Sequence, residues 1–185
     1  MLPIVAVGHP TLKKIAEEIG PDYPDLKELI DMMFETMYES RGVGLAAPQV
    51  NKSIRLFLVD ARPYGNEEDD AKEFVKVFIN AKIINESGEK WSFNEGCLSV
   101  PGINEDVERH AIVEIEYMDT DFKPHKETYS GILARIIQHE YDHLEGTLFV
   151  DRLSSLKKAL IKGKLVKISK GEVDVNYRMI FPKKK

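Results

Sequence analysis

Three residues whose types and spacing could perform chemistry stand close together, namely His139, Glu140 and His143. The two histidines are four residues apart, so on a helix both imidazoles project from one face and can share one metal ion. Glu140 is rotated by about 100° around the helix axis, which places it beside such a metal without ligating it. There its carboxylate can take a proton from a water molecule. The His-Glu-x-x-His pattern therefore predicts a metal-dependent hydrolase.

Two histidines do not complete such a site, because a catalytic metal usually takes three protein ligands. One large class of metalloproteases uses a histidine six residues after the second one, and Phe149 occupies that position here. A glutamate from a following helix is another solution, but the predicted helix near 154–162 contains none, and Glu172 lies beyond it. Cys97 is the remaining candidate, since a thiolate is a good ligand for zinc or ferrous iron.

Composition limits the classes of protein that fit. The 185 residues suit one domain, and 43% apolar with 31% charged residues is typical of a globular protein. The net charge of -5 argues against direct binding of nucleic acid, which needs clustered lysine and arginine. The single cysteine cannot form an internal disulfide. We find neither a signal peptide nor an apolar run of about 18 residues, so we expect no membrane contact and a cytoplasmic location.

The elements that must position these residues follow from periodicity and turn signals. Helical spacing of apolar residues predicts helices near 11–19, 24–41, 131–146 and 154–162, the third beginning after Ser130 as its cap. Strands are expected at 54–59, 75–79, 83–85, 112–117 and, last, 173–177. The acidic run at 67–70 is interpreted as a solvated loop. We assign 1–153 to a catalytic domain and 154–185 to a C-terminal helix and tail packed on the same domain.

Three segments together resemble the peptide deformylase family. They are GVGLAAPQ at 42–49, EGCLS at 95–99 and QHEYDHLEG at 138–146. Their order matches the family's three blocks, and the resemblance spans about residues 1–150. It implies an α+β fold in which antiparallel strands surround the helix that carries the His-Glu-x-x-His motif, with Cys97 arriving from a strand or its edge.

The resemblance also implies a role for individual residues. By similarity, the metal ligands are Cys97, His139 and His143. Glu140 would be the general base and then the acid, while the Gln49 amide and the Leu98 backbone N–H would donate to the developing oxyanion. The substrate pocket is expected to take an unbranched apolar side chain and to be lined by Val43, Gly44, Ile132 and Ile136. Glu95 is a candidate either for orienting a ligand histidine or for pairing with Arg109, and Asp142 is another candidate for orienting a ligand histidine.

The reaction implied is removal of the formyl group from the N-terminal formylmethionine of newly synthesised polypeptides. Nascent formylated chains are then the substrate, and the ribosome is a possible partner. The family resemblance favours Fe(II) as the metal, although two imidazoles and a thiolate also suit Zn, Ni or Co.

Two other classes remain open from the residues alone. One is a zinc metallopeptidase that cleaves internal peptide bonds, which Phe149 and the thiolate disfavour. The other is a non-catalytic binding module stabilised by a closed metal site. A closed site needs a fourth protein ligand, for which the remaining histidines are His9, His110 and His125.

Overall fold

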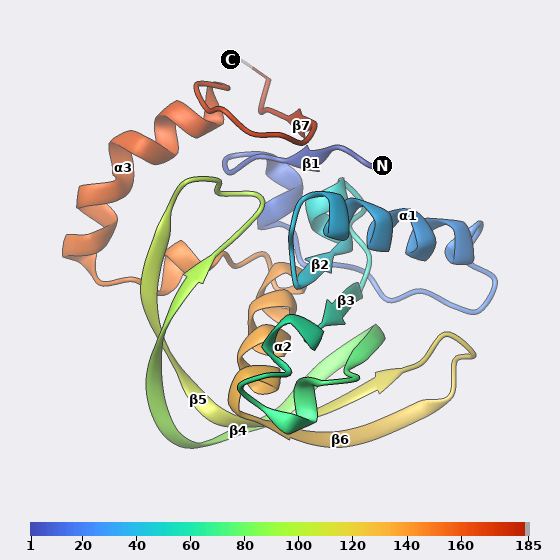
Figure 1. Cartoon of the computed structure of the whole chain (residues 1–185). Coiled ribbons are helices and arrows are strands. Elements are labelled where there is room, and N and C mark those ends of the chain that lie inside the picture. The colour runs from blue at the N-terminus through green and yellow to red at the C-terminus, as the bar shows by residue number, and fades with distance from the viewer. Residues whose placement is uncertain (184–185) are drawn as a thin grey trace.

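The computed structural model describes residues 1–183 and shows an α+β arrangement around one central helix (Figure 1). The strands are β1 (Ile4–Val5), β2 (Gly44–Ala46), β3 (Leu56–Asp60), β4 (Val75–Gly96), β5 (Asn104–Met118), β6 (Pro124–Ser130) and β7 (Met179–Ile180). The α-helices are α1 (Leu26–Glu39), α2 (Gly131–Leu144) and α3 (Ser155–Ser169). Short 3-10 turns lie at Pro10–Lys13, Ala47–Val50, Arg62–Tyr64, Asp69–Ala71 and Phe149–Arg152.

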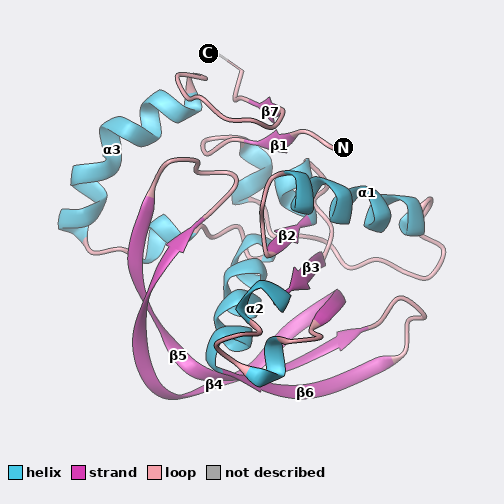
Figure 2. Ribbon diagram, viewed as in Figure 1, coloured by secondary structure: helices cyan, strands magenta, loops and turns pink. Residues whose placement is uncertain are grey.

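The main sheet has five strands in the order β2-β3-β4-β5-β6, and all neighbours are antiparallel. The strands predicted at 75–79 and 83–85 are parts of the single strand β4, and 112–117 lies inside β5. Register shifts at Ile79/Lys82 and Ser87/Lys90 bend β4, because bulges increase local twist. The long strands therefore curve around α2 (Figure 2).

Helix α2 is buried along most of its length, as the apolar spacing predicts. Ile137 and Leu144 are fully buried, and Leu133 is nearly so, in a core formed with the inner face of the sheet. Ser130 occupies the N-cap position, but its side chain makes no capping bond. The Glu68 carboxylate accepts from the Ile132 N–H at 3.1 Å instead. The prediction that 67–70 is only a solvated loop is therefore wrong for Glu68, which caps the helix from a distant turn.

The N-terminal part of the chain departs from the predicted helix near 11–19. Only the 3-10 turn Pro10–Lys13 forms, after which Ala16 donates its N–H to the Leu144 carbonyl at 2.8 Å. Glu17 then forms a parallel bridge with Ile54. These bonds to α2 and to the start of β3 replace helical bonds, and Ile15 is left 69% exposed. Tertiary hydrogen bonding therefore overrides the helical periodicity here.

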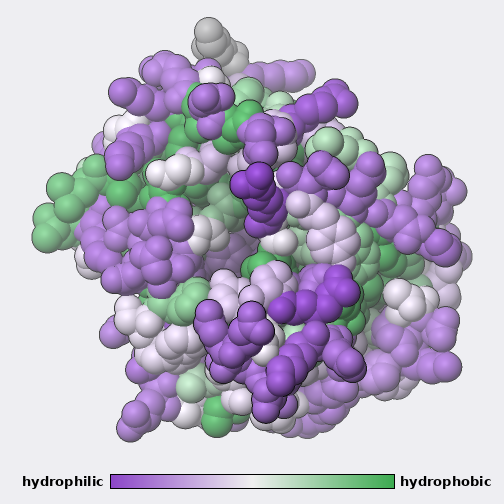
Figure 3. Space-filling view, viewed as in Figure 1, coloured by the Kyte–Doolittle hydropathy of each residue, from purple (hydrophilic) through white to green (hydrophobic). Residues whose placement is uncertain are grey.

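The C-terminal part begins with α3, whose N-cap Ser154 accepts from the Lys157 N–H as expected. The helix runs to Ser169, past the predicted end near 162. Only Ile161 and Ile168 of α3 are buried. On its outer face, Leu156 and Leu160 are 72% and 74% exposed, and Figure 3 shows green, hydrophobic residues at this end of the molecule.

After α3 the chain returns to the N-terminus. The final strand is β7 at Met179–Ile180, which pairs in parallel with β1. The strand predicted at 173–177 does not form. Residues 173–177 form no ladder, and Tyr177 instead donates its hydroxyl to a distant backbone carbonyl. Within residues 1–183, no helix is long and apolar enough to cross a membrane.

Candidate active site

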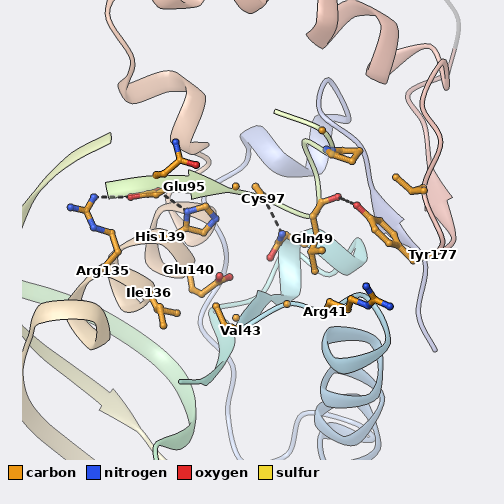
Figure 4. A pocket seen from close by; sticks show the side chains of 18 of the residues that line it. Arg41, Val43, Gln49, Glu95, Cys97, Arg135, Ile136, His139, Glu140 and Tyr177 are labelled. Carbon is orange, nitrogen blue, oxygen red and sulfur yellow. Dashed lines mark hydrogen bonds and ion pairs between the residues drawn. The ribbon is translucent and has the colours of Figure 1, made fainter. Parts of the chain in front are cut away.

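Three donor atoms converge where α2 passes the end of β4. His139 and His143 come from α2, and Cys97 follows the last residue of β4. Figure 4 shows His139 and Cys97 facing the same pocket. The ligand atoms of these residues all lie within 4.8 Å of one another, and the Cys97 sulfur is 3.5 Å from His143 Nε2. This set can hold one metal ion, and its two imidazoles and thiolate suit Zn, Fe(II), Co or Ni.

The surroundings of these donors fit a bound cation. Burial opposes a proton on His139, but hydrogen bonds to Cys97 and Glu95 outweigh it and hold the pKa of the imidazole well above its usual value. Burial and the charge of His139 hold the pKa of His143 well below its usual value, which keeps that ring neutral as a ligand must be. Binding of a metal ion by the three donors would displace the proton from His139, because a ligating imidazole must be neutral.

Glu95 fixes the orientation of His139 from behind. Its Oε2 lies 2.9 Å from His139 Nδ1, which leaves Nε2 facing Cys97. Arg109 donates from Nε to the Glu95 Oε1 at 2.7 Å, and Arg135 donates to the same oxygen at 2.8 Å. Burial opposes ionisation of Glu95, but the bonds from His139 and Arg109 outweigh it and hold the carboxyl pKa well below its usual range.

Sequence reasoning proposed that Glu95 contacts either a ligand histidine or Arg109, and it contacts both. Asp142 contacts neither ligand histidine: it accepts from Arg109 at 2.7 Å and from Arg152. All of these charged side chains except Arg152 are almost completely buried. The cluster therefore couples α2 to β4 and β5 beneath the donor set.

Glu140 points into the same space with a free oxygen. The residue is 4% exposed, and within the described part of the chain its Oε2 has no hydrogen-bond partner. Burial raises the pKa of the carboxyl to about 7. A Cβ on Gly44 would stand 2.4 Å from Glu140 Oε1, so only glycine at 44 lets the carboxylate lie there. An unpaired buried carboxylate is a candidate proton acceptor.

A hydrogen bond from the backbone determines which way the Gln49 side-chain amide points. The Ala46 N–H donates to Gln49 Oε1 at 2.8 Å, so the NH₂ group must face the other way. There Nε2 donates to the Cys97 sulfur at 3.5 Å and to Ser99 Oγ at 3.4 Å. The Leu98 N–H donates no hydrogen bond to any residue among 1–183. The Leu98 N–H is therefore a free donor beside the donor set, and the Gln49 NH₂ group points toward the same place.

A cavity of about 570 Å³ opens in front of these groups. Val43, Gly44 and Ile136 line it, as the sequence predicts. Ile132 does not: it is 4% exposed and packs in the core with the sheet, one turn too far from the donors. Further lining residues come from five separate segments, namely Tyr64, Phe93, Pro101, Arg135 and 174–177.

Sequence reasoning missed two of the residues around the site. Arg135 reads as an ordinary polar position in an amphipathic helix, yet it is 2% exposed and stacks 4.5 Å from the centre of the Trp91 ring. Its position four residues before His139 places it on the same face of the helix, and this spacing could have indicated that it lies at the site. Tyr177 gave no signal, because its contact spans 79 residues.

The other three histidines supply no fourth ligand. Among the described residues, only Cys97, His139 and His143 form a group of converging donors. His110 Nδ1 lies 2.9 Å from the Gly88 carbonyl, and His125 Nε2 lies 2.7 Å from Asp119. With three ligands, the site keeps a position for water or substrate, which distinguishes a catalytic centre from a closed structural one.

The fold and this site define a metal-dependent hydrolase. The family model for polypeptide deformylase matches residues 1–159, and the chain belongs to that family. It therefore removes N-formyl groups from nascent polypeptides. This result excludes the metallopeptidase and the non-catalytic binding module that the residues alone left open.

Individual relatives agree in sequence and in structure. A peptide deformylase of Christiangramia forsetii is 55% identical over all of this chain and 98% of its own length. One of Flavobacterium johnsoniae is 54% identical over 98% of this chain and 96% of its own. The crystal structure of a plant peptide deformylase has a TM-score of 0.82 at 35% identity and covers 96% of each chain.

Proposed function

We propose that Cys97, His139 and His143 hold the metal ion of this deformylase. Support comes from the convergence of their three donor atoms and from Glu95, which lies 2.9 Å from His139 Nδ1 and leaves Nε2 for the metal. When bound, the ion supplies Lewis acidity that lowers the pKa of water from about 15.7 toward 7. Fe(II) is the metal we propose, with Zn, Ni and Co as substitutes that the same ligands accept.

We propose Glu140 as the general base and acid. Its buried, unpartnered oxygen can accept a proton from the attacking water as oxygen bonds to the formyl carbon. The carbon–nitrogen bond then breaks, and the same carboxyl gives its proton to the leaving amine. Formate and a free N-terminal methionine result, and no covalent intermediate with the protein is needed.

The Gln49 amide and the Leu98 N–H are our proposed donors to the formyl oxygen. Both lie beside Cys97, and neither adds a charge to the site. Donors fixed in advance stabilise negative charge that develops only in the transition state, and losing one typically costs about 10²–10³ in rate.

The substrate pocket we propose lies between Val43, Gly44 and Ile136. Gly44 begins β2, which is an edge strand because it pairs only with β3 in the sheet. The free edge of such a strand can pair with the backbone of an extended peptide. The apolar side chain of the first residue then enters the cavity toward Ile136.

The single observation that carries these roles is the free carboxylate oxygen of Glu140 beside three converging donors. The test uses a formyl-Met-Ala-Ser peptide and measures formate and new amino termini separately. We expect wild type to release formate only, and Gln49→Leu to lower kcat by about 10²-fold with bound metal unchanged. Release of formate at the wild-type rate by Gln49→Leu would contradict the proposed donor.

Metal identity has its own test. A ferrous ion bound by a thiolate is sensitive to oxygen, so we expect protein loaded with Fe(II) without air to be more active than the Zn-loaded form and to lose activity in air. Equal, air-stable activity of both forms would reject Fe(II) as the preferred metal.

We further propose a cytoplasmic location and association with the ribosome, since the substrate is a chain still being synthesised. Helix α3 offers a contact surface, with Leu156 and Leu160 exposed beside Lys157 and Lys158. Cosedimentation with ribosomes tests this proposal, with Lys157→Glu/Lys158→Glu as the comparison. Equal cosedimentation of both proteins would place any contact elsewhere.

A further inference from the structure

The C-terminal segment reaches the active site through one tyrosine. The Tyr177 hydroxyl donates to the Leu98 carbonyl at 2.8 Å, and both residues line the cavity (Figure 4). Tyr177 lies beyond residue 159, where the match to the family model ends. The contact is therefore a feature of this chain's C-terminal segment and not of the catalytic motifs.

The hydrogen bond from Tyr177 is one of three that hold the successive backbone carbonyls of Cys97, Leu98 and Ser99. The Cys97 carbonyl accepts from the Val100 N–H at 2.9 Å, which closes a local turn. The Ser99 carbonyl accepts from the Val7 N–H at 2.8 Å. The Leu98 carbonyl, between them, has Tyr177 as its donor. Each peptide group after Cys97 is thus fixed, and two of the three by distant segments.

The two distant segments support each other. Tyr177 lies two residues before β7, and Val7 lies two residues after β1. β1 and β7 pair in parallel, with Ile4 opposite Met179. The two-stranded sheet therefore ties the chain termini together and presents both donors to the same loop.

We propose that Tyr177 is a positioning residue for deformylation. It acts by holding the Leu98 carbonyl and so the backbone conformation of Leu98. The inference rests on the proposed role of the Leu98 N–H as an oxyanion donor. Such a donor must lie within about 2.7–3.1 Å of the developing oxyanion. The Leu98 N–H has no bond of its own among residues 1–183, and it shares a peptide group with the Cys97 carbonyl, which the Val100 N–H holds. The Leu98 carbonyl belongs to the next peptide group, so holding it fixes the backbone dihedral angles of Leu98 on the other side of the N–H. Among the described residues, Tyr177 supplies the one hydrogen bond to the Leu98 carbonyl.

The test is Tyr177→Phe, which removes the hydroxyl and keeps the half-buried ring. We expect kcat on a formyl-Met peptide to fall about 10-fold, less than the 10²–10³ for a donor lost outright, with KM changed less than twofold. The amide nitrogen shift of Ser99, which shares a peptide group with the Leu98 carbonyl, should change as well. Tyr117→Phe is the matched control, because its hydroxyl donates to Glu127 away from the cavity.

The absorption spectrum of the cobalt-loaded protein distinguishes an effect through the Leu98 backbone from an effect through the metal ligand Cys97. In the cobalt-loaded protein, the thiolate and ligand-field bands report on Cys97, and we expect Tyr177→Phe to leave them unchanged. A kcat within twofold of wild type would overturn the inference, and so would altered cobalt bands, because the effect would then act through the metal ligand. If wild type itself releases no formate, the proposed catalytic roles fail instead.

Discussion

Helices α2 and α3 have nearly the same length, 14 and 15 residues, and opposite surroundings. The sheet curves around α2, and a buried charge cluster (Glu95, Arg109, Arg135 and Asp142) lies beneath the face of α2 that carries His139 and His143. α3 lies at the side of the molecule and buries only two of its side chains (Figure 1). A helix that carries reacting groups must hold them to within fractions of an ångström, and contact on all sides achieves this.

The difference predicts that similar changes have unequal effects in the two regions. Substitutions around α2 should lower stability or activity strongly, whereas those on α3 should leave catalysis unaffected.

The buried charge cluster gives the largest expected effect on stability. Glu95→Ala removes the carboxylate that pairs with Arg135 and one of the two carboxylates that pair with the buried Arg109, so we expect the free energy of unfolding to fall by about 3–5 kcal/mol. His139 also loses the group that orients it, so metal affinity should fall about 10–100-fold. Urea denaturation and competition with a chelator measure the two effects.

The dependence on pH provides the control for Glu95. Because its pKa is lowered in the folded state, the ionised carboxylate stabilises the protein fully above its ordinary pKa of 4.5 and progressively less as the pH falls below it. The difference in unfolding free energy between wild type and Glu95→Ala should therefore shrink between pH 5 and pH 3. A difference that stays constant or grows over that range would contradict the role of this ion pair.

Gly44 tests how closely Glu140 must be placed. The Cβ of Gly44→Ala would overlap Glu140 Oε1, so the carboxylate must move by about 1 Å, and such a shift can cost about 10² in kcat. The steady-state rate of formate release measures it. An alanine variant with more than half of the wild-type kcat would show that the carboxylate position is not restricted in this way.

The sequence predicted the donor set better than the parts that support it. His139, Glu140 and His143 lie within five residues, so helical geometry alone places them together. Cys97 followed from the need for a third ligand. The cap from Glu68 and the contact of Tyr177 could not be predicted, because each joins residues 64 or more positions apart. For Arg135, the spacing from His139 was the one signal.

The errors in the fold have the same origin. The apolar spacing at 11–19 fits a helix, but bonds to Leu144 and Ser53 use the backbone there instead. Two strands were predicted where β4 is continuous, since a bulge beside Asn80, which has a φ of 52°, lets the chain stay in the sheet. Periodicity describes local preference, whereas pairing partners and bulges are set by the rest of the chain.

The cap on α2 should give a moderate effect. Glu68→Ala removes the carboxylate that accepts from the Ile132 N–H, so we expect about 1 kcal/mol less stability. The donor set lies two turns away, so kcat should stay within twofold of wild type. Thermal or urea unfolding and formate release check both parts, and an unchanged unfolding free energy would show that solvent replaces the cap.

The smallest effect is expected on α3. Gly163 is exposed, and a Cβ there meets nothing within 4 Å, so Gly163→Ala should raise the unfolding free energy by about 0.5–1 kcal/mol. Its kcat should match that of wild type. This variant is also the matched control for Gly44→Ala, and a loss of activity here would break the contrast between the two helices.

The most direct test of the account is the kcat of Glu140→Gln on a formyl-Met peptide, measured on protein with the same metal content as wild type. The amide has the shape of the carboxylate, so the contact with Gly44 remains, but it cannot accept the proton. We predict that kcat falls by about 10²–10⁴ while one metal ion per chain stays bound. A variant that keeps more than a tenth of the wild-type kcat would contradict the assignment of Glu140 as the base.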